Sequence, residues 1–356
     1  MQIEEILGKI TKQGASDIFI VAGRPLSYKI GSQIMEEGEA KLMPAATDEY
    51  ITQIYELAEG RDMERLRKYG DDDFSFAIRD VARFRINAYK QRGSLAAVIR
   101  VITFKIPNPQ SRGIPDKIME FADKKKGLVL ITGPAGSGKS TTLACMIDHI
   151  NKTRQSHIIT LEDPIEYLHP HDMSIVSQRE VVTDTESYIT ALRASLRQSP
   201  DVILLGEMRD YETMNVAMTA AETGHLILST LHTIGASNTI DRIIDAFPPN
   251  QQHQIAIQLS MVLQAVVSQQ LLPSTDGKIV PAFEIMTLTP AIRSMIRDSK
   301  VHQIDGMIYS SAADDMIAMD TSILNLYKEG RITEKTALTY ATNAELLQKK
   351  INMISR

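Results

Sequence analysis

Hydrophobic positions follow three successive patterns along the chain. At the start, apolar residues recur at every third or fourth position, which predicts a short amphipathic helix over residues 2–13. Short β-rich runs then alternate with helical stretches up to about residue 102, the pattern of a small α+β domain. From residue 116 onward, continuous apolar runs separated by helical patterns predict a parallel sheet with right-handed crossovers, which is an α/β domain.

The first region carries the signals of helices and of half-buried strands. Gly23-Arg24-Pro25 predicts a turn, and Gly70 predicts the end of a helix. Apolar and polar residues that alternate toward the end of the region predict paired strands. The expected strands are residues 17–22, Phe74–Asp80, Arg83–Gln91 and Ala96–Thr103, and the expected helices are residues 47–58 and 61–69.

The second region begins after a segment without apolar periodicity. Residues 104–115 contain three prolines and a glycine, a composition typical of an interdomain linker. A helix is expected at 116–125, strands at 127–132, 157–162, 201–207, 225–230, 265–272 and 278–285, and only helix from Pro290 on, with a boundary at Gly330. The predicted division is a domain at 1–102, a linker at 103–115, an α/β core at 116–288 and a helical region at 289–356.

Composition and charge exclude several classes of protein. The chain has 356 residues, a net charge of −5, 5% aromatic residues and no Trp, so nucleic acid is not an expected partner. No stretch approaches about 18 consecutive apolar residues, which predicts no transmembrane segment. Glu4 and Glu5 stand where a secretory signal carries positive charge, so we expect a cytoplasmic protein. Cys145 is the only cysteine, which excludes an intrachain disulfide and zinc sites built on several cysteines.

The strongest chemical signal is a glycine-rich segment between the strand 127–132 and a predicted helix. It matches the G-x-x-x-x-G-K-[ST] pattern, in which backbone N–H groups surround phosphates and the helix N-terminus adds positive potential. Lys139 is predicted to neutralise the β- and γ-phosphates of ATP, and the Ser140 hydroxyl to ligate Mg²⁺. The predicted nucleotide-binding residues are Gly133, Pro134, Ala135, Gly136, Ser137, Gly138, Lys139, Ser140 and Thr141.

Acidic residues follow two of the predicted buried strands. Glu207 ends one strand at a place where a carboxylate can activate water in line with a γ-phosphate, and Gly206 before it permits close approach of the backbone. The other group, after the strand 157–162, consists of Glu162, Asp163 and Glu166. At least one of these three is expected to hold Mg²⁺ or its waters, and the alternative is an ordinary solvated loop.

Histidines and arginines complete the candidate set. His225 and His232 flank one strand and are candidates for sensing a γ-phosphate, although a lone histidine is more often structural. Arg83 and Arg85 share one face of a strand, which suits a fork presented to a phosphate. If that phosphate is bound by another subunit, they are arginine fingers and the enzyme is an oligomer.

A second arginine pair lies in the α/β region. Arg193 and Arg197 are four residues apart, so they share one face of a predicted helix and are candidate nucleotide contacts. Ordinary surface charge is the alternative for these two arginines, as it is for Arg83 and Arg85.

Several segments together resemble the PilT family, the retraction ATPases of type IV pili within the secretion-ATPase superfamily. The resemblance covers nearly the whole chain and rests on the combination of segments, not on the phosphate loop alone. The segments are GLVLITGPAGSGKST at 127–141, IITLEDPIEYLHP at 158–170, VSQREV at 176–181, ALRASLRQSPDVILLGEMRD at 191–210 and AAETGHLILSTLHT at 220–233.

The resemblance implies a PAS-like N-terminal domain, a RecA-like ATPase domain and a C-terminal helical extension, assembled as a cytoplasmic hexameric ring. It also implies Mg²⁺-dependent ATP hydrolysis that drives pilin subunits back into the membrane through an inner-membrane platform protein, with another pilus ATPase as a further partner. The family's Asp box falls on Glu162, Asp163 and Glu166, its Walker B acid on Glu207, its His box on His225 and His232, and its arginine fingers on Arg83 and Arg85.

Three positions depart from the family pattern. Ala135 stands where Thr is usual, and Ala82 where Gly is usual. AIRSMIRD at 291–298 resembles the AIRNLIRE retraction signature without equalling it, so a retraction motor and an accessory subunit both remain open.

Two further alternatives are a secretion or conjugation ATPase of the same superfamily and a non-hydrolysing, nucleotide-binding subunit of a mixed ring. A nucleic-acid translocase has the weakest support, because the net charge is negative and aromatic residues are few.

Overall fold

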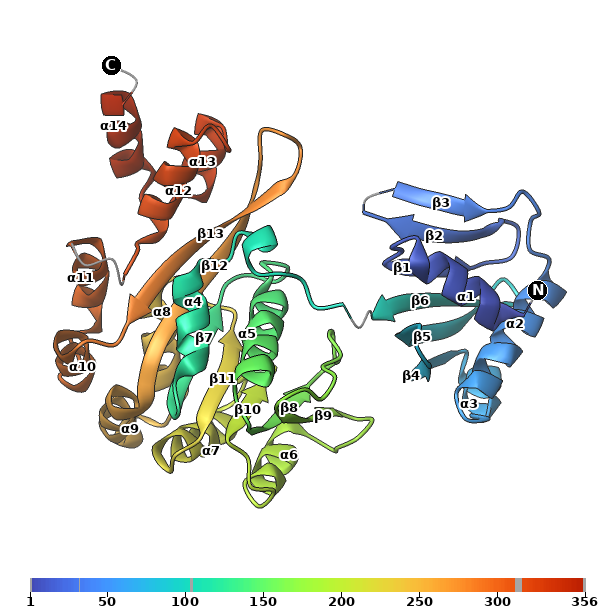
Figure 1. The fold of residues 1–356 in the computed structure, drawn as a ribbon, viewed down its shortest axis with the longest axis horizontal. Helices are drawn as coiled ribbons and strands as arrows, with labels where there is room; N and C mark the ends of the chain where they lie inside the picture. The colour runs from blue at the N-terminus through green and yellow to red at the C-terminus, as the bar shows by residue number, and fades with distance from the viewer. Residues whose placement is uncertain (1, 32, 103–104, 311–315, 355–356) are drawn as a thin grey trace. The chain divides into compact units, whose positions relative to one another are not determined.

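The computed structural model describes residues 2–31, 33–102, 105–310 and 316–354 (Figure 1). The chain forms two compact units, of which the first contains Met1–Lys105 and Glu166–Leu168 and the second contains Ile106–Ile165 and His169–Arg356. The first two residues of the predicted linker, 103 and 104, and the last residue of the strand predicted at Ala96–Thr103 lie outside the described residues.

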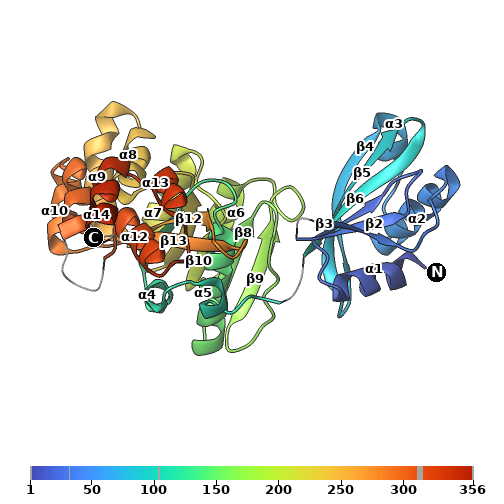
Figure 2. The same ribbon diagram turned by 90° about the horizontal axis from the view of Figure 1, so that it is seen from above.

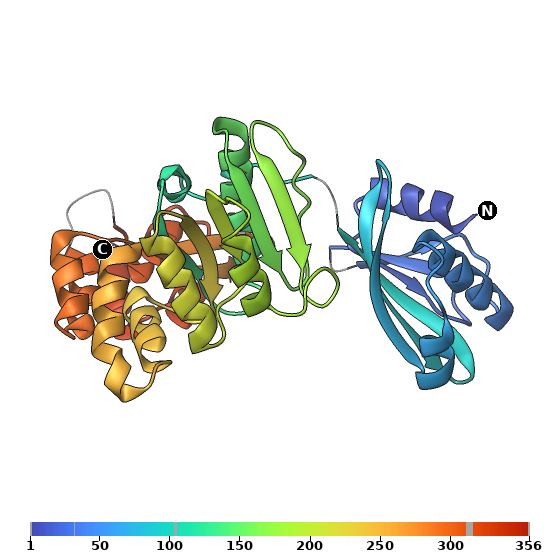
Figure 3. The ribbon, with the colours of Figure 1, turned by 90° about the horizontal axis from the view of Figure 1, so that it is seen from below.

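The first unit is an antiparallel sheet with helices packed on one face. The six strands lie in the order β3-β2-β1-β6-β5-β4, and α1, α2 and α3 lie on the same side of them (Figure 3). The helices are α1 (Ile3–Lys12), α2 (Pro44–Leu57) and α3 (Glu64–Tyr69), and the strands are β1 (Asp17–Ile20), β2 (Leu26–Ile30), β3 (Gln33–Glu37), β4 (Asp71–Ile78), β5 (Ala82–Gln91) and β6 (Ser94–Ile102).

The hairpin of β2 and β3 is the main element of this unit that the pattern did not predict. Its register pairs Leu26 with Glu37 and Ile30 with Gln33. β3 is an edge strand with exposed side chains along nearly its whole length, so it lacks the alternation that marks a half-buried strand. The helix predicted to begin at residue 47 begins at Pro44, because proline at the first helical position has a backbone angle that already suits a helix.

A buried ion pair joins the helical layer of the first unit to its sheet. The Asp72 side chain is 1% exposed and receives two hydrogen bonds from Arg61, at 2.9 and 3.0 Å, and one from the Tyr55 hydroxyl at 2.9 Å. Burial by itself raises the pKa of Asp72, but the hydrogen bonds from Arg61 and Tyr55 and the charges of Arg61 and Arg65 outweigh it and lower the pKa. The carboxylate is therefore held ionised and stabilises the fold.

Replacing Asp72 by asparagine removes the buried negative charge that pairs with Arg61. We expect this to destabilise the first unit by about 2 kcal/mol, which is less than for a fully buried pair because Arg61 stays partly solvated. Amide hydrogen exchange of β4–β6 in the full chain should accelerate about thirtyfold. Because the folded-state pKa is lowered, the stabilisation is complete above about pH 4 and is lost as the pH falls through the folded pKa. Asp73→Asn, which breaks an exposed pair, is the matched control, and equal acceleration in both variants would contradict this assignment.

The second unit is built on a seven-stranded sheet in the order β13-β12-β7-β11-β10-β8-β9. Every neighbouring pair is parallel except β12 and β13. The strands are β7 (Gly127–Thr132), β8 (His157–Glu162), β9 (Ile175–Glu180), β10 (Val202–Leu205), β11 (Leu226–Leu231), β12 (Leu263–Pro273) and β13 (Ile279–Thr287).

Helices cover both faces of this sheet, in a three-layer α/β arrangement (Figures 1 and 2). One face packs on α4 (Asp116–Glu120) and α5 (Lys139–Thr153). The opposite face packs on α6 (Tyr188–Ser195), α7 (Tyr211–Glu222), α8 (Ala236–Asp245) and α9 (Pro249–Val262). Three 3₁₀ segments complete the connections, at Gln110–Arg112, Phe121–Asp123 and Val301–Gln303.

The C-terminal region is helical, as predicted from Pro290 onward, apart from an isolated bridge between Ile285 and Ile317. Its helices are α10 (Pro290–Arg297), α11 (Ile304–Ser310), α12 (Met319–Lys328), α13 (Glu334–Tyr340) and α14 (Ala344–Ile354). The first two extend the core under α8 and α9, whereas the last three form a separate apolar cluster with the ends of β12 and β13. The predicted fold class is confirmed: an α/β domain with a smaller N-terminal α+β domain and a C-terminal helical extension.

Two details of the α/β domain differ from the pattern-based prediction. β9 was not predicted, because four of its six residues are polar and a fifth, Ile175, is exposed at the edge of the sheet. The helix predicted over 116–125 ends at Glu120 and continues as a 3₁₀ turn. Among the described residues, no helix is long and apolar enough to cross a membrane.

Candidate nucleotide site

The glycine-rich loop connects β7 to α5 at the carboxyl edge of the parallel strands. Gly133 has a φ of 141°, and a Cβ at this position would lie 2.2 Å from the carbonyl oxygen of Gln269 and 2.7 Å from the Ser137 hydroxyl. Only glycine fits there. The loop is therefore pressed against β12, and its backbone turns back before the helix begins at Lys139.

Charge and unsatisfied polar groups gather in this loop. Lys139 is 8% exposed, and its ammonium donates to the carbonyl oxygens of Gly133 at 2.8 Å and Pro134 at 3.0 Å. The Ser137 hydroxyl is buried and finds no hydrogen-bond partner among the described residues. The N-terminus of the 15-residue α5 faces the same loop. A buried cation, an orphaned hydroxyl and a helix N-terminus fit a phosphate chain.

The strand order determines how far the candidate acids lie from the loop. β11 lies between β7 and β10, so Glu207 follows a strand that is two positions from the loop strand, and β8 is three positions away. At the usual strand spacing, these steps are about 10 and 14 Å. The strands are parallel, so their carboxyl ends still share one edge. His232, which follows the intervening β11, lies between the loop and Glu207 along this edge.

Glu207 is the best-placed carboxylate at this edge. Its Oε1 forms an ion pair with Arg209, its Oε2 lies 3.3 Å from His232 Nε2, and its side chain is 13% exposed. Burial raises the pKa of Glu207, but the hydrogen bonds and charges of Arg209 and His232 outweigh it and lower the pKa. The structure therefore brings together two predicted residues, Glu207 and His232, and adds Arg209.

Tyr188, the first residue of α6, is a further residue of this edge that sequence reasoning missed. A Cβ on Gly206 would lie 2.7 Å from the Tyr188 hydroxyl and 3.3 Å from the Leu161 carbonyl oxygen, so glycine is required there for space. Burial, followed by the charges of Glu207, Asp163 and Glu162, raises the pKa of Tyr188. The protonated Tyr188 hydroxyl therefore lies near three carboxylates. Only the tertiary fold brings these groups together.

The three acids of the Asp box differ in their hydrogen bonding and exposure. Glu162 Oε1 accepts hydrogen bonds from the Thr160 hydroxyl at 2.6 Å and from Gln178 at 3.3 Å. Asp163 and Glu166 are exposed in the loop after β8. Within the described residues, no group of three His, Cys, Asp or Glu side chains could hold a metal ion. The donor set of the Ser140 hydroxyl with the Glu162 or Asp163 carboxylate fits Mg²⁺, which is usually bound by one or two carboxylates together with phosphates and waters.

His225 is a correction to the predicted site. It precedes β11, whose first residue pairs with Gly127 at the beginning of β7, and its Nδ1 lies 2.9 Å from the Ala220 carbonyl oxygen. The loop 133–138 follows the other end of β7. The length of the strand, about 20 Å for six residues, therefore separates His225 from the phosphate loop of its own protomer.

The prediction that Arg193 and Arg197 share one helix face is wrong. Only Arg193 lies within α6, where it is 3.8 Å from Glu212, whereas Arg197 follows the end of the helix. The neighbouring Gln198 carbonyl oxygen is 2.8 Å from His157 at the beginning of β8, which places Arg197 toward the amino edge of the sheet. The contact of either arginine with a nucleotide therefore remains a prediction.

Arg83 and Arg85 lie on β5 with their side chains on the face opposite the buried Phe84. Arg85 holds Asp73 through two hydrogen bonds, at 3.2 and 2.9 Å, and both side chains of this pair are partly exposed. These arginines belong to the first unit and the phosphate loop to the second. The contact of Arg83 and Arg85 with a nucleotide therefore remains a prediction.

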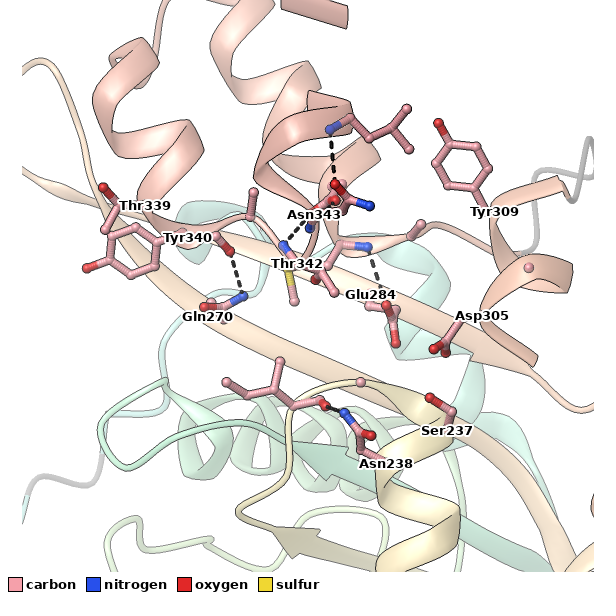
Figure 4. A pocket seen from close by; sticks show the side chains of 18 residues that line it. Ser237, Asn238, Gln270, Glu284, Asp305, Tyr309, Thr339, Tyr340, Thr342 and Asn343 are labelled. Carbon is pink, nitrogen blue, oxygen red and sulfur yellow. Dashed lines mark hydrogen bonds between the residues drawn. The ribbon is translucent and has the colours of Figure 1, made fainter. Parts of the chain in front are cut away.

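A separate cavity of about 590 Å³ lies between the start of α8 and the C-terminal helices (Figure 4). Two of its carboxylates accept hydrogen bonds from backbone N–H groups at helix starts: Glu284 from Ala236 at 2.8 Å and Met319 at 3.4 Å, and Asp320 from Thr342 and Asn343. Burial raises the pKa of Glu284. These bonds tie the C-terminal helices to the segment that follows His232, which is a structural role.

The parallel sheet, the glycine-rich loop with Lys139 and the acid that follows β10 define a P-loop nucleoside-triphosphatase. The family described as "Type II/IV secretion system protein" matches residues 1–338. The chain belongs to this family, and it is a PilT-like ATPase.

Three comparisons support this assignment. The chain is 42% identical to "Type IV pilus retractation ATPase PilT" of Pseudomonas aeruginosa over 95% of this chain and 97% of that protein. It is 39% identical to "Type IV pilus ATPase PilU" of the same organism, over 99% and 92%. A solved structure of the pilus retraction motor PilT with bound ADP aligns with a TM-score of 0.89 and 44% identity, covering 98% of this chain and 99% of that one.

Proposed function

We propose that the chain is a motor that couples Mg²⁺-dependent ATP hydrolysis to type IV pilus retraction, as a ring of six copies on the cytoplasmic side of the inner membrane. The observation that carries the proposal is the match over both units and the C-terminal helices to PilT, a protein described as a pilus retraction ATPase. Its partners in this proposal are the membrane platform protein and a second pilus ATPase.

In the proposed mechanism, the loop amides and Lys139 hold the β- and γ-phosphates, and the orphaned Ser137 hydroxyl supplies a further donor. Ser140, with Asp163 or Glu162, would hold Mg²⁺, which neutralises charge on the phosphoryl oxygens when bound. Glu207, ionised and oriented by Arg209 and His232, polarises the attacking water and accepts its proton. Glu166 and His232 adjust the position of that water, and His232 responds to the γ-phosphate.

Completion of the site by a neighbouring subunit is part of the proposal. Arg85 would exchange Asp73 for the transferred phosphate of the adjacent protomer, and Arg83 would contact the same phosphate. Such arginines typically contribute about 10³–10⁵ in rate. The exchange costs little, since an exposed pair of this kind is worth only about 0–1 kcal/mol.

A second candidate function is an accessory pilus ATPase. It is favoured by the 39% identity to PilU over 99% of this chain, and by AIRSMIRD at 291–298 in place of the retraction signature. Deleting the gene in its own organism and scoring pilus retraction separates the two functions: a motor is essential for retraction, whereas an accessory subunit is needed only when another ATPase is weakened.

Hydrolysis itself is tested by the dependence of phosphate production on protein concentration. Because a neighbour completes the proposed site, the specific activity should rise with concentration until the ring is assembled, and removal of Mg²⁺ with EDTA should abolish it. Added DNA should leave the rate unchanged. A constant specific activity at concentrations where the chain is monomeric would overturn completion in trans.

A further inference from the structure

A second cavity, of about 480 Å³, opens beside Glu207 between the ends of β10 and β11 and helix α8. Its polar lining consists of Glu207, Arg209, Thr230, His232, Thr233 and Arg242, and no residue of the loop 133–140 lines it. One water takes about 30 Å³ of liquid volume, so the cavity has room for a hydrated oxyanion.

Exposure increases along this cavity from Glu207 outward. The Glu207 side chain is 13% exposed, whereas those of His232 and Arg209 are 60% and 68% exposed, and Arg242 is exposed on α8. The cavity therefore leads from the proposed water-activating group to solvent, and a guanidinium stands at its outer part.

The lining carries two guanidinium groups and a histidine against one carboxylate. Arg209 is already paired with Glu207. Among the residues that the structure describes, the Arg242 side chain makes no hydrogen bond or ion pair, so its charge is available to a ligand. A planar guanidinium suits a phosphate, because its N–H groups bond two oxygens at once. The expected ligand is thus a small oxyanion.

We propose that this cavity is a transient binding site for inorganic phosphate as it leaves the nucleotide site, with Arg242 as the group that receives it. The inference rests on the proposed function. In that reaction the water oxygen bonds to the γ-phosphorus, the bond from phosphorus to the bridging oxygen breaks, and its electron pair stays on ADP. Glu207 accepts a water proton and returns it to the phosphate or to solvent. ADP still fills the loop, so the phosphate departs on the Glu207 side, toward Arg242.

Rapid mixing of the full chain with Mg·ATP tests this exit route. Quench-flow measures all phosphate formed, and a fluorescent phosphate-binding protein measures phosphate released. In Arg242→Gln, formation in the first turnover should stay within about twofold of the unmodified chain, whereas release should lag behind formation and be at least about fivefold slower. Arg242→Lys, which keeps the charge, should recover at least half of the release rate. Arg67→Gln, an exposed arginine of the first unit, is the matched control.

The outcomes separate the exit route from the proposed function. If release and formation coincide in Arg242→Gln, phosphate leaves by another route and the inference is wrong. If both slow together, Arg242 acts on the chemical step or on assembly, which also overturns it. If the unmodified chain forms no phosphate, the proposed hydrolysis itself fails, and the exit route fails with it.

Discussion

Replacing Glu207 by glutamine is expected to lower ATP turnover at least about 100-fold while ATP binding stays within about threefold. Glutamine has nearly the same shape and can still contact Arg209, but it cannot accept a proton. General-base groups typically contribute about 10²–10⁴ in rate. Binding should persist, because Lys139 and the loop amides lie two strands away from this carboxylate. Steady-state phosphate release and titration with a fluorescent ATP analogue measure the two quantities.

Glu212→Gln is the control for this prediction. Glu212 lies at the beginning of α7, is 52% exposed and is 3.8 Å from Arg193, so its loss should change turnover less than twofold. Turnover of Glu207→Gln within threefold of the unmodified chain would remove Glu207 from the mechanism. The acids at the end of β8 and in the loop after it would then become the candidates for activating the water.

The strands of the α/β core could be predicted from sequence because burial on both faces leaves a continuous apolar run. GLVLIT is buried at every position of β7, and LILSTL is buried at every position of β11. The order of the strands could not be predicted in this way. β11 lies between the loop strand and β10, although it follows β10 in the chain, because strand order depends on crossover packing and not on local pattern.

The parts of the site that lie in one continuous segment of sequence could be predicted. The contacts between residues that are far apart in sequence could not. The phosphate loop is one contiguous segment, so spacing alone identified it. His225 and His232 are near in sequence, but β11 lies between them. They therefore lie at opposite ends of this strand, and only His232 contacts Glu207. Tyr188 could not be predicted, because its contact with Gly206 joins the start of α6 to the end of β10.

Mixing two inactive variants is expected to restore activity. A chain with Arg83→Ala and Arg85→Ala lacks the proposed fingers, and a chain with Glu207→Gln lacks the proposed base, so each alone should lose at least about 100-fold in turnover. In a ring assembled from equal amounts, about a quarter of the sites combine an intact Glu207 with an intact arginine pair from the neighbour, if the fingers act in trans. Phosphate release of the co-expressed mixture should therefore reach about a quarter of the unmodified rate.

Asp73→Asn is the control for this prediction, because it removes the partner of Arg85 and keeps both arginines. In the protomer, Arg85 is held by Asp73 at 2.9 Å, a partly exposed pair, and breaking this pair leaves both arginines in place. Turnover of Asp73→Asn should therefore stay within about threefold of the unmodified chain, since exposed pairs contribute about 0–1 kcal/mol. If the mixture shows no more activity than the sum of its two parts, each arginine pair serves the site of its own protomer. The proposed ring would then be unnecessary for ATP hydrolysis.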